Sequence, residues 1–359
     1  PYVGQWKESK ARFPHGVRVT TDYIRSLGMR AGLWIEPEIV GKDCTEMLSY
    51  YEDECFIRRN GKKVCVMGRY FLDFRNAKVV QYMSDTIRRM VEDYGADYIK
   101  MDYNEDVGIG TDVISDSFGE GLEQCAAAYL AWTDEMRVRF PQTLFETCSS
   151  GGMRMDYRTL AHFSVVSTSD QTHYDKYPYI AGNVLSAVLP EQAAVWSYPV
   201  GSDYVINGVF TPDKQWIADN VGDEQVVMNM VNSFLGRMHL ASHLEMLPER
   251  QLAFVKEGIE YFDALSAVKK AALPCLPSGF TQFEAPCVAS GFTAGDKLYL
   301  AVWNLSDNDL KRKIEVGRQY TSAICAYPQN NKLAFELFDG TLTVHFTQKN
   351  QARFFELKK

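Results

Sequence analysis

The chain has 359 residues, of which 46% are hydrophobic, enough for one large barrel domain and a smaller partner. Its formal net charge of -8 argues against nucleic-acid binding, which needs a basic surface, and no apolar run approaches the roughly 18 residues of a membrane span. The 8 cysteines are scattered without a Cys-x-x-Cys pair, so a zinc site is disfavoured and a reduced, cytoplasmic protein is expected.

From the N-terminus to about Leu273, helical patterns alternate with short apolar runs that end in polar residues. This alternation predicts βα units around a parallel sheet, with the polar strand ends at the active-site face of a barrel. Helices are predicted at 17–27, 79–94, 122–140, 155–160, 224–235 and 248–265, and strands at 31–35, 98–102, 143–147, 164–167, 193–198 and 238–242. Because these are about six strands where a TIM barrel has eight, we expect an α/β fold in which 1–273 is a (β/α)8 barrel with its first strands missing.

The pattern changes after Pro274 to short alternating strands, with turn signals such as Asp339-Gly340 between them. Strands are predicted at 297–303, 323–327 and 341–346. We therefore expect a small antiparallel β-sandwich domain over 274–359, without a catalytic cluster of its own.

Asp102 ends the apolar strand 98–102, two residues after Lys100. Residues two apart in a strand point to the same side, and a neighbouring ammonium group keeps a carboxylate ionised. An ionised carboxylate is what a glycosidase nucleophile must be. From the residues alone, a catalytic nucleophile and a structural ion pair at the end of a strand are equally good interpretations of Asp102.

Asp170 follows another predicted strand, in the run Ser167-Thr168-Ser169-Asp170. Two carboxylates at the C-terminal ends of two parallel strands can face each other across a barrel mouth. A retaining glycosidase needs them roughly 5–5.5 Å apart, one as nucleophile and one as acid/base. The alternative for Asp170 is an Asx-turn or a helix N-cap.

Other polar segments follow the predicted strands. Glu36 and Glu38 add two acids after Trp34, and the small residues of 148–152 would let the backbone approach a ligand or simply make a tight turn. The run Asp102-x-Asn104-x-Asp106 starts like a calcium loop, but valines stand where such a loop needs Gly and Glu. We therefore predict no metal site.

Four motifs stand in a fixed order along the chain: GLWIEPE at 32–38, YIKMDYN at 98–104, CSSGGMRMD at 148–156 and TSD at 168–170. In this order and spacing they closely resemble the α-galactosidases of glycoside hydrolase family 36, over about Trp6 to Leu265. One motif alone would be weak, whereas four in register favour the catalytic interpretation of both aspartates.

The resemblance implies a retaining double displacement on a (β/α)8 barrel, with Asp102 as nucleophile and Asp170 as acid/base. It also implies six substrate-binding residues: Trp34 lining the galactose pocket, Arg69 reaching the sugar, Lys100 and Asn104 binding hydroxyl groups, and Cys148 and Gly151 contacting the 2-substituent.

Two departures from the family pattern are expected to reshape the pocket rim. Met101 stands where the family usually has Trp, and Gln-Thr-His at 171–173 replaces Asn-Thr-Asp. The paired aspartates that hold the sugar's O4 and O6 in the family are not found, and neither is its N-terminal β-sandwich. We therefore expect a fragment of a longer protein.

The expected function is removal of terminal α-galactosyl residues from oligosaccharides, without a metal or organic cofactor. The expected partner is the α-galactoside substrate, with no nucleic acid and no membrane, and the oligomeric state, including a homo-oligomer, is left open. Two alternatives remain: an α-N-acetylgalactosaminidase of the same family, or an inactive carbohydrate-binding or structural fragment if the barrel is incomplete.

Overall fold

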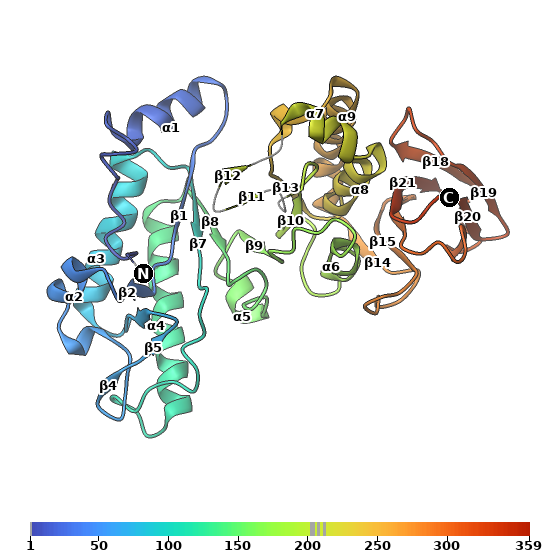
Figure 1. Ribbon diagram of the computed structural model, residues 1–359. Helices are drawn as coiled ribbons and strands as arrows, with labels where there is room; N and C mark the ends of the chain where they lie inside the picture. Colours follow the sequence, from blue (N-terminus) through green and yellow to red (C-terminus); the bar gives the residue numbers. More distant parts are fainter. Residues whose placement is uncertain (1, 202–204, 207–208, 211–212) are drawn as a thin grey trace. The chain divides into compact units, whose positions relative to one another are not determined.

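The structure is a computed structural model that describes residues 2–201, 205–206, 209–210 and 213–359. The chain divides into two compact units, Pro1–Ser167 and Thr168–Lys359, which run from blue to green and from green to red in Figure 1. The predicted domain boundary between residues 273 and 274 lies inside the second unit and stays a prediction. Within the described ranges, no helix combines the length and apolarity needed to cross a bilayer.

Parallel strands form the centre of the first unit. In sheet order they are β1 (Gly32–Ile35), β7 (Tyr98–Met101), β8 (Leu144–Thr147) and β9 (Val165–Ser167). Trp34 pairs with Lys100, and Lys100 pairs with Glu146, so these three residues form one row across the sheet. The parallel pairing confirms the βα units predicted for this part of the chain.

The helices of the first unit begin where the sequence supplies a cap. Asn76 accepts the N–H of Lys78 at 2.9 Å to start α3, and Ser117 accepts the N–H of Glu120 at 3.2 Å to start α4. The predicted helix 79–94 is thus an α-helix followed by a π-helical turn, and the predicted helix 122–140 begins earlier. The bounds are α1 (Val17–Ser26), α2 (Thr45–Tyr50), the 3-10 turn η1 (Asp53–Cys55), α3 (Ala77–Arg88), the π-helical turn η2 (Arg89–Asp93), α4 (Phe118–Arg139) and α5 (Tyr157–Leu160).

Two small antiparallel sheets lie between β1 and α3 in sequence and were not predicted. Their strands are two or three residues long, too short for an alternating pattern to show. One sheet has the order β2 (Ile39–Gly41), β6 (Arg69–Phe71), β5 (Cys65–Val66), and the other pairs β3 (Arg58–Arg59) with β4 (Lys62–Lys63). The first of them holds Arg69 at the start of β6.

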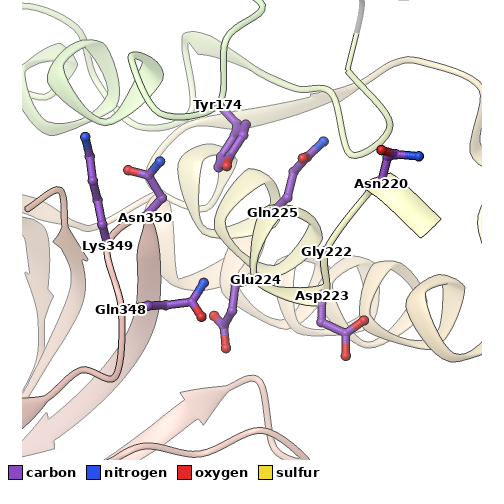
Figure 2. A pocket seen from close by; sticks show the side chains of 9 residues that line it. All are labelled: Tyr174, Asn220, Gly222, Asp223, Glu224, Gln225, Gln348, Lys349 and Asn350. Carbon is purple, nitrogen blue, oxygen red and sulfur yellow. The ribbon is translucent and has the colours of Figure 1, made fainter. Parts of the chain in front are cut away.

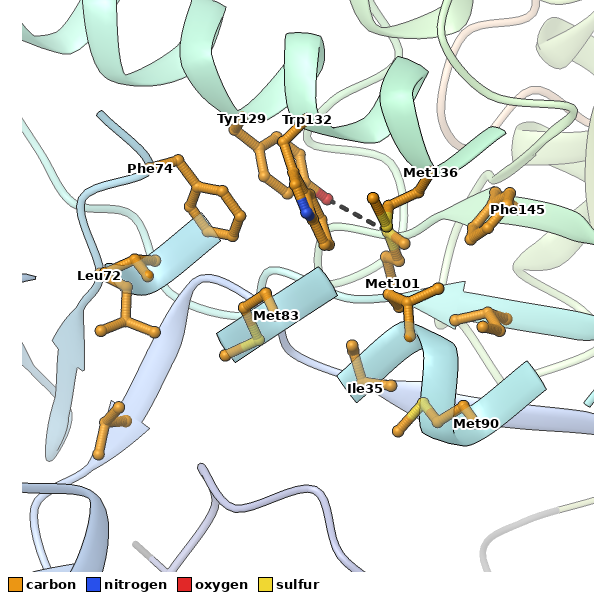
Figure 3. Packing of buried hydrophobic residues seen from close by; sticks show 14 of the residues in the cluster. Ile35, Leu72, Phe74, Met83, Met90, Met101, Tyr129, Trp132, Met136 and Phe145 are labelled. Atoms are coloured by element: carbon orange, nitrogen blue, oxygen red, sulfur yellow. Dashed lines mark hydrogen bonds between the residues drawn. The ribbon is translucent and has the colours of Figure 1, made fainter. Parts of the chain in front are cut away.

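The core of the first unit lies between its strands and the helices α3 and α4 (Figure 3). Ile35 and Phe145 come from the strands, Met83 from α3 and Trp132 from α4, and all four are at most 2% exposed. This packing covers one face of the sheet with helices, as a βα barrel wall requires.

Met101 belongs to this core. It is 1% exposed, and the Tyr129 hydroxyl donates to its sulfur at 3.7 Å (Figure 3). The expectation that Met101 reshapes a pocket rim is therefore wrong. Strand alternation turns Met101 towards the helices and its neighbours Lys100 and Asp102 towards the opposite face.

The second unit begins with two further parallel strands and the helices that follow them. β10 (Ala193–Ser197) pairs with β13 (Arg237–Leu240), with Trp196 opposite His239. The Ser197 hydroxyl approaches the Met230 sulfur of α8 at 3.7 Å, so α8 covers one face of this strand pair. The remaining bounds are α6 (Tyr177–Val184), β11 (Val205–Ile206), β12 (Val209–Phe210), α7 (Lys214–Asn220), α8 (Asp223–Ser233), the 3-10 turn η3 (Leu244–Met246) and α9 (Glu249–Lys269).

Two antiparallel sheets complete the second unit. One has the order β14 (Leu273–Cys275), β15 (Cys287–Ala294), β16 (Lys297–Asn304), β21 (Gln351–Lys358), β18 (Ser322–Tyr327), and the other β17 (Lys311–Glu315), β20 (Thr341–His345), β19 (Ala334–Phe338). Both contribute to one apolar cluster, with Leu300 and Phe355 from the first sheet and Ile314 and Val344 from the second. The predicted strands 297–303, 323–327 and 341–346 correspond to β16, β18 and β20, whereas the other strands were not predicted.

Helix α8 packs directly against the first of these sheets. The buried Trp303 indole donates to Asn232 Oδ1 at 2.8 Å. Arg353, which is 0% exposed, donates to both carboxylate oxygens of Glu224 at 2.7 and 2.8 Å. Buried polar contacts therefore join α8 to the C-terminal strands within the second unit.

Candidate active site

Asp102 lies immediately after β7 and is held by three N–H donors. Its Oδ1 accepts the Tyr103 N–H at 2.8 Å and the Ser150 N–H at 3.4 Å, and its Oδ2 accepts the Trp34 indole N–H at 3.0 Å. The Asp102 backbone N–H donates to Ile35 O at 2.8 Å, so β1 fixes the main chain here. Asp102 is 8% exposed, and the three hydrogen bonds that its carboxylate accepts fix the orientation of that group.

Lys100 reaches a buried polar cluster beside Asp102. Its ammonium group donates to Ser167 Oγ at 3.1 Å and lies 3.5 Å from Glu146 Oε1. Ser167 in turn donates to Glu146 at 2.6 Å, and the Tyr98 hydroxyl donates to the other oxygen of Glu146. Glu146 is 1% exposed.

Glu146 and Ser167 were missed as site residues. The signal was present, because a glutamate interrupts the otherwise apolar run of the strand 143–147 and lies opposite Lys100 in the parallel register. The predicted pairing of Lys100 with Asp102 as a charge partner stays a prediction, and the contacts described here are with Glu146 and Ser167.

Arg69 and Asn104 meet at a second carboxylate. The Asn104 amide donates to Glu36 Oε1 at 2.7 Å, and Arg69 Nε lies 3.7 Å from Glu36 Oε2. Arg69 also donates to Glu105 at 2.9 Å. Glu36 is 1% exposed, and from this buried position it contacts both Asn104 and Arg69, two of the predicted sugar-binding residues.

The small-residue loop 148–152 folds back towards Asp102. The Cys148 N–H donates to Met101 O at 2.8 Å, and Gly151 adopts a φ of 88°, a conformation open mainly to glycine. Burial raises the pKa of the Cys148 thiol to about 11, so this side chain is a neutral thiol at physiological pH. The buried Ser149 hydroxyl has no hydrogen-bond partner among the residues that the structure describes.

Trp34 presents an accessible aromatic surface beside the carboxylate. Its side chain is 42% exposed while its indole N–H is bound to Asp102, and Trp6 contacts it edge-on with a ring distance of 5.7 Å. A ring that is open on one side and anchored by its polar edge suits stacking against a sugar.

Arg154 is a further residue that sequence reasoning passed over, although it lies inside the third motif. It forms a two-bonded ion pair with Glu38 at 2.5 and 3.1 Å and covers the Tyr103 ring at 3.6 Å. Arg154 thus packs on the ring of Tyr103, whose N–H donates to Asp102.

Asp170 lies in the second unit and is exposed. Two residues earlier, the Thr168 hydroxyl donates to Ala194 O at 2.6 Å, which anchors this segment to β10. Burial raises the pKa of Tyr177 to about 12, and the negative charge of Asp170 adds to this shift. Asp170 is not the N-cap of α6, because that position is Lys176.

The two predicted catalytic carboxylates belong to different compact units. Asp102 lies in Pro1–Ser167 and Asp170 in Thr168–Lys359. Their separation, and with it the retaining geometry, therefore stays a prediction. Within the described part of the chain, no three His, Cys, Asp or Glu side chains gather as a metal site would require.

Comparisons with known proteins find a matching family and several similar proteins. A family model described as melibiase matches residues 2–185. Alpha-galactosidase Mel36A of Lactobacillus acidophilus is 28% identical over 173 residues, which cover 47% of this chain and 23% of that protein. Alpha-galactosidase AgaA of Geobacillus stearothermophilus is 29% identical over 175 residues, covering 47% of this chain and 24% of that protein.

A solved structure shares the fold over nearly the whole chain. It is a variant of the family 36 alpha-galactosidase AgaA from Geobacillus stearothermophilus in complex with raffinose. The TM-score is 0.76 at 18% identity, and the match covers 99% of this chain and 48% of that chain. The chain thus spans about half the length of this solved relative.

Proposed function

The chain belongs to the melibiase family, and from that premise we propose that it carries the catalytic half of a retaining glycoside hydrolase that removes terminal α-galactosyl residues from oligosaccharides. The observation that carries the proposal is the Asp102 carboxylate, bound by three N–H donors at the end of a parallel strand beside an open indole ring. Relatives named as alpha-galactosidases support the choice of sugar.

In the proposed first step, an Asp102 oxygen attacks the anomeric carbon while protonated Asp170 gives its proton to the leaving oxygen. The anomeric C–O bond breaks, and a glycosyl ester forms on Asp102. In the second step, Asp170 takes a proton from water, the water oxygen attacks the anomeric carbon, and the ester bond breaks. Each aspartate thereby returns to its starting state, and the configuration is retained.

The sugar-binding roles proposed for the surrounding residues come from the family resemblance, and the way neighbouring side chains hold them supports these roles. The open face of Trp34 takes the apolar side of the galactose ring, and Lys100, Asn104 and Arg69 supply donors for its hydroxyl groups. The Cys148–Gly151 loop would contact the 2-substituent, which distinguishes galactose from N-acetylgalactosamine. Paired assays of the two nitrophenyl glycosides separate these substrates.

The same proposal covers the architecture. The parallel strands of the two units are segments of a (β/α)8 barrel, and residues 274–359 form a β-sandwich domain whose two sheets already share a core. The 8 cysteines are all free thiols, which agrees with a cytoplasmic location.

The acid role of Asp170 is tested by Asp170→Ala with two leaving groups. We expect the loss of kcat/KM on melibiose to be on the order of 10²–10⁴, because a sugar leaving group needs a proton, and the loss on a dinitrophenyl galactoside to be far smaller. Asp175→Ala, in the same loop, is the matched control and should leave both substrates nearly unchanged. Equal losses on both substrates would exclude the acid role.

A further inference from the structure

The second unit contains a polar pocket of about 580 Å³ at the N-terminal end of α8, facing the loop that joins β20 to β21 (Figure 2). Four of the side chains around it are amides, two are carboxylates, one is a phenol and one is an ammonium group. They include Tyr174, Asn220, Gln225, Gln348, Lys349 and Asn350. Such groups combine donors and acceptors, which is the composition that hydroxyl-rich ligands require.

The loop side of the pocket is held in place independently of any ligand. Gln351 Oε1 accepts the N–H groups of Thr347 at 2.8 Å and Gln348 at 3.2 Å, and the Lys349 N–H donates to Asp307 at 2.8 Å. These bonds involve backbone N–H groups and hold the main chain of the loop in place. The side chains of Gln348 and Lys349 take no part in them.

The charges around the pocket do not suit an ion. Glu224 is neutralised by the buried Arg353 through two hydrogen bonds, and Asp223 is paired with Arg250. With both acids paired, the pocket lacks the free carboxylates that a divalent cation needs. The two ion pairs balance the charges of these acids, and the amides that line the pocket suit a neutral polar ligand.

One buried atom in the pocket lacks a partner. A hydrogen bond from Asn350 reaches the Tyr174 hydroxyl, whereas Asn350 Oδ1 is buried without a hydrogen-bond partner among the described residues. Figure 2 shows Asn350 and Tyr174 next to each other at the edge of the pocket. A buried acceptor left unsatisfied is unfavourable, and a ligand hydroxyl would supply the missing donor.

Hydrogen bonds link the pocket to the segments that follow Asp170 and β10. In a βα unit the helix starts near the C-terminal end of the preceding strand, and the Gln225 amide donates to Pro199 O at 3.3 Å, just beyond β10. Tyr174 follows Asp170 by a few residues and is bound through its carbonyl to Asn232 at 3.0 Å. Tyr174 and Gln225 of the pocket are thus tied to neighbouring segments of the second unit, one of which follows Asp170.

We propose that this pocket binds a neutral saccharide, through Asn350, Gln348 and Tyr174, as a further site beyond the one around Asp102. Its use for the distal sugars of an oligosaccharide substrate rests on the proposed function, whereas saccharide binding itself does not. The pocket volume is within the range of about 300–1,000 Å³ of small-molecule sites.

The test uses the whole chain in an Asp102→Asn background, so that no sugar is consumed. Raffinose binding is measured by calorimetry, and hydrogen exchange of the peptide spanning 346–351 reports binding at the pocket. Asn350→Gly and Gln348→Ala should each raise the Kd about three- to tenfold, the size of one lost hydrogen bond, and reduce the protection of this peptide. Gly suits the φ of 57° at position 350, so the first variant keeps the loop.

Lys313→Ala, an exposed change on β17 outside the pocket, is the matched control and should leave the Kd unchanged. Galactose is titrated in parallel. If both sugars respond to the pocket variants the site takes single sugar units, and if only raffinose responds it takes the distal part of an oligosaccharide. Unchanged raffinose binding in both variants, or no protection of 346–351, would overturn the proposal. A chain without galactosidase activity whose pocket variants still weaken binding would refute only the proposed function.

Discussion

At the residue scale, the ammonium group of Lys100 is held by a carboxylate that is almost completely removed from water. Glu146 accepts hydrogen bonds from the hydroxyl groups of Ser167 and Tyr98, and its Oε1 lies 3.5 Å from Lys100 Nζ. The Lys100 ammonium group is therefore the cation that balances the charge of Glu146. Lys100 therefore combines two tasks. It neutralises Glu146, and it is positioned by Glu146 for the proposed contact with a sugar hydroxyl.

Removal of Lys100 should therefore destabilise the protein strongly. Lys100→Met leaves Glu146 buried without its cation, and we expect the free energy of unfolding to fall by about 3–5 kcal/mol. Lys7→Met is the matched control, because Lys7 pairs with Glu46 at a site where both side chains are more than half exposed, and it should change stability by less than about 1 kcal/mol. Urea denaturation measures both, and equal small effects would show that the cluster does not depend on its charge balance.

The alternating pattern of a strand predicts which face each side chain occupies, and the residue predictions succeeded or failed with its use. Alternation along 98–102 correctly placed Lys100 and Asp102 on one face, but Met101 was assigned to a pocket rim although the same alternation turns it into the core. Ser150 and Glu36 bind Asp102 and Asn104 through contacts between distant segments. Such contacts are set by tertiary packing and leave no periodic signal in the sequence.

At the element scale, the C-terminal end of α9 buries a lysine. Lys269 is 3% exposed, donates to Gly236 O at 2.6 Å and lies 4.1 Å from the centre of the Phe262 ring. Burial lowers the pKa of Lys269 from 10.5 to about 7, and the nearby charge of Arg237 adds to this. The helix end is therefore anchored on Gly236, just before β13, by an ammonium group with a pKa near 7.

This anchor makes stability depend on pH in a defined direction. Between the folded pKa of about 7 and the unfolded value near 10.5, the unfolded chain binds more protons, so the Lys269 contribution to stability becomes more favourable as pH rises. From pH 7 to 9 we expect wild type to gain about 2 kcal/mol relative to Lys269→Met. The neighbouring exposed Lys270→Met should show no such trend. A pH-independent difference between wild type and Lys269→Met would contradict this.

The elements that could be predicted were those with a clear period. The long helices α4 and α9 and the strands β7, β8 and β16 were found, with ends displaced by a few residues. Strand β15 was missed because its central residues are small, and β21 because a continuous buried run replaces alternation. Both are interior strands, which cannot be distinguished from other apolar segments by period alone.

At the scale of the whole molecule, the second unit joins barrel-type helices and C-terminal strands through buried polar contacts. Arg353 of β21 bonds to Glu224 of α8, and Trp303 of β16 bonds to Asn232 of the same helix. The sequence pattern changes at Pro274, which is why a domain boundary was predicted there. The two contacts above join residues on either side of that position within the second unit, and the boundary itself stays a prediction.

Loss of the Arg353 contact should loosen α8 and the strands together. Arg353→Met leaves Glu224 without its partner, and we expect a loss of about 3–5 kcal/mol in unfolding free energy. Hydrogen exchange should rise in peptides of α8 and of β16 and β21 alike. Arg318→Met, whose side chain is 80% exposed, is the control and should change neither. Faster exchange in the strands alone would show that residues 274–359 unfold separately.

The central claim, that Asp102 is the nucleophile, is tested most directly by covalent trapping. The chain is incubated with an activated fluoro-galactoside, digested, and the labelled peptide is identified by mass spectrometry. The account predicts one label on Asp102, and Asp170→Ala should still accept it, because an activated leaving group does not need the acid. A label on another carboxylate would contradict the assignment, and the absence of both label and turnover would contradict the proposed function as a whole.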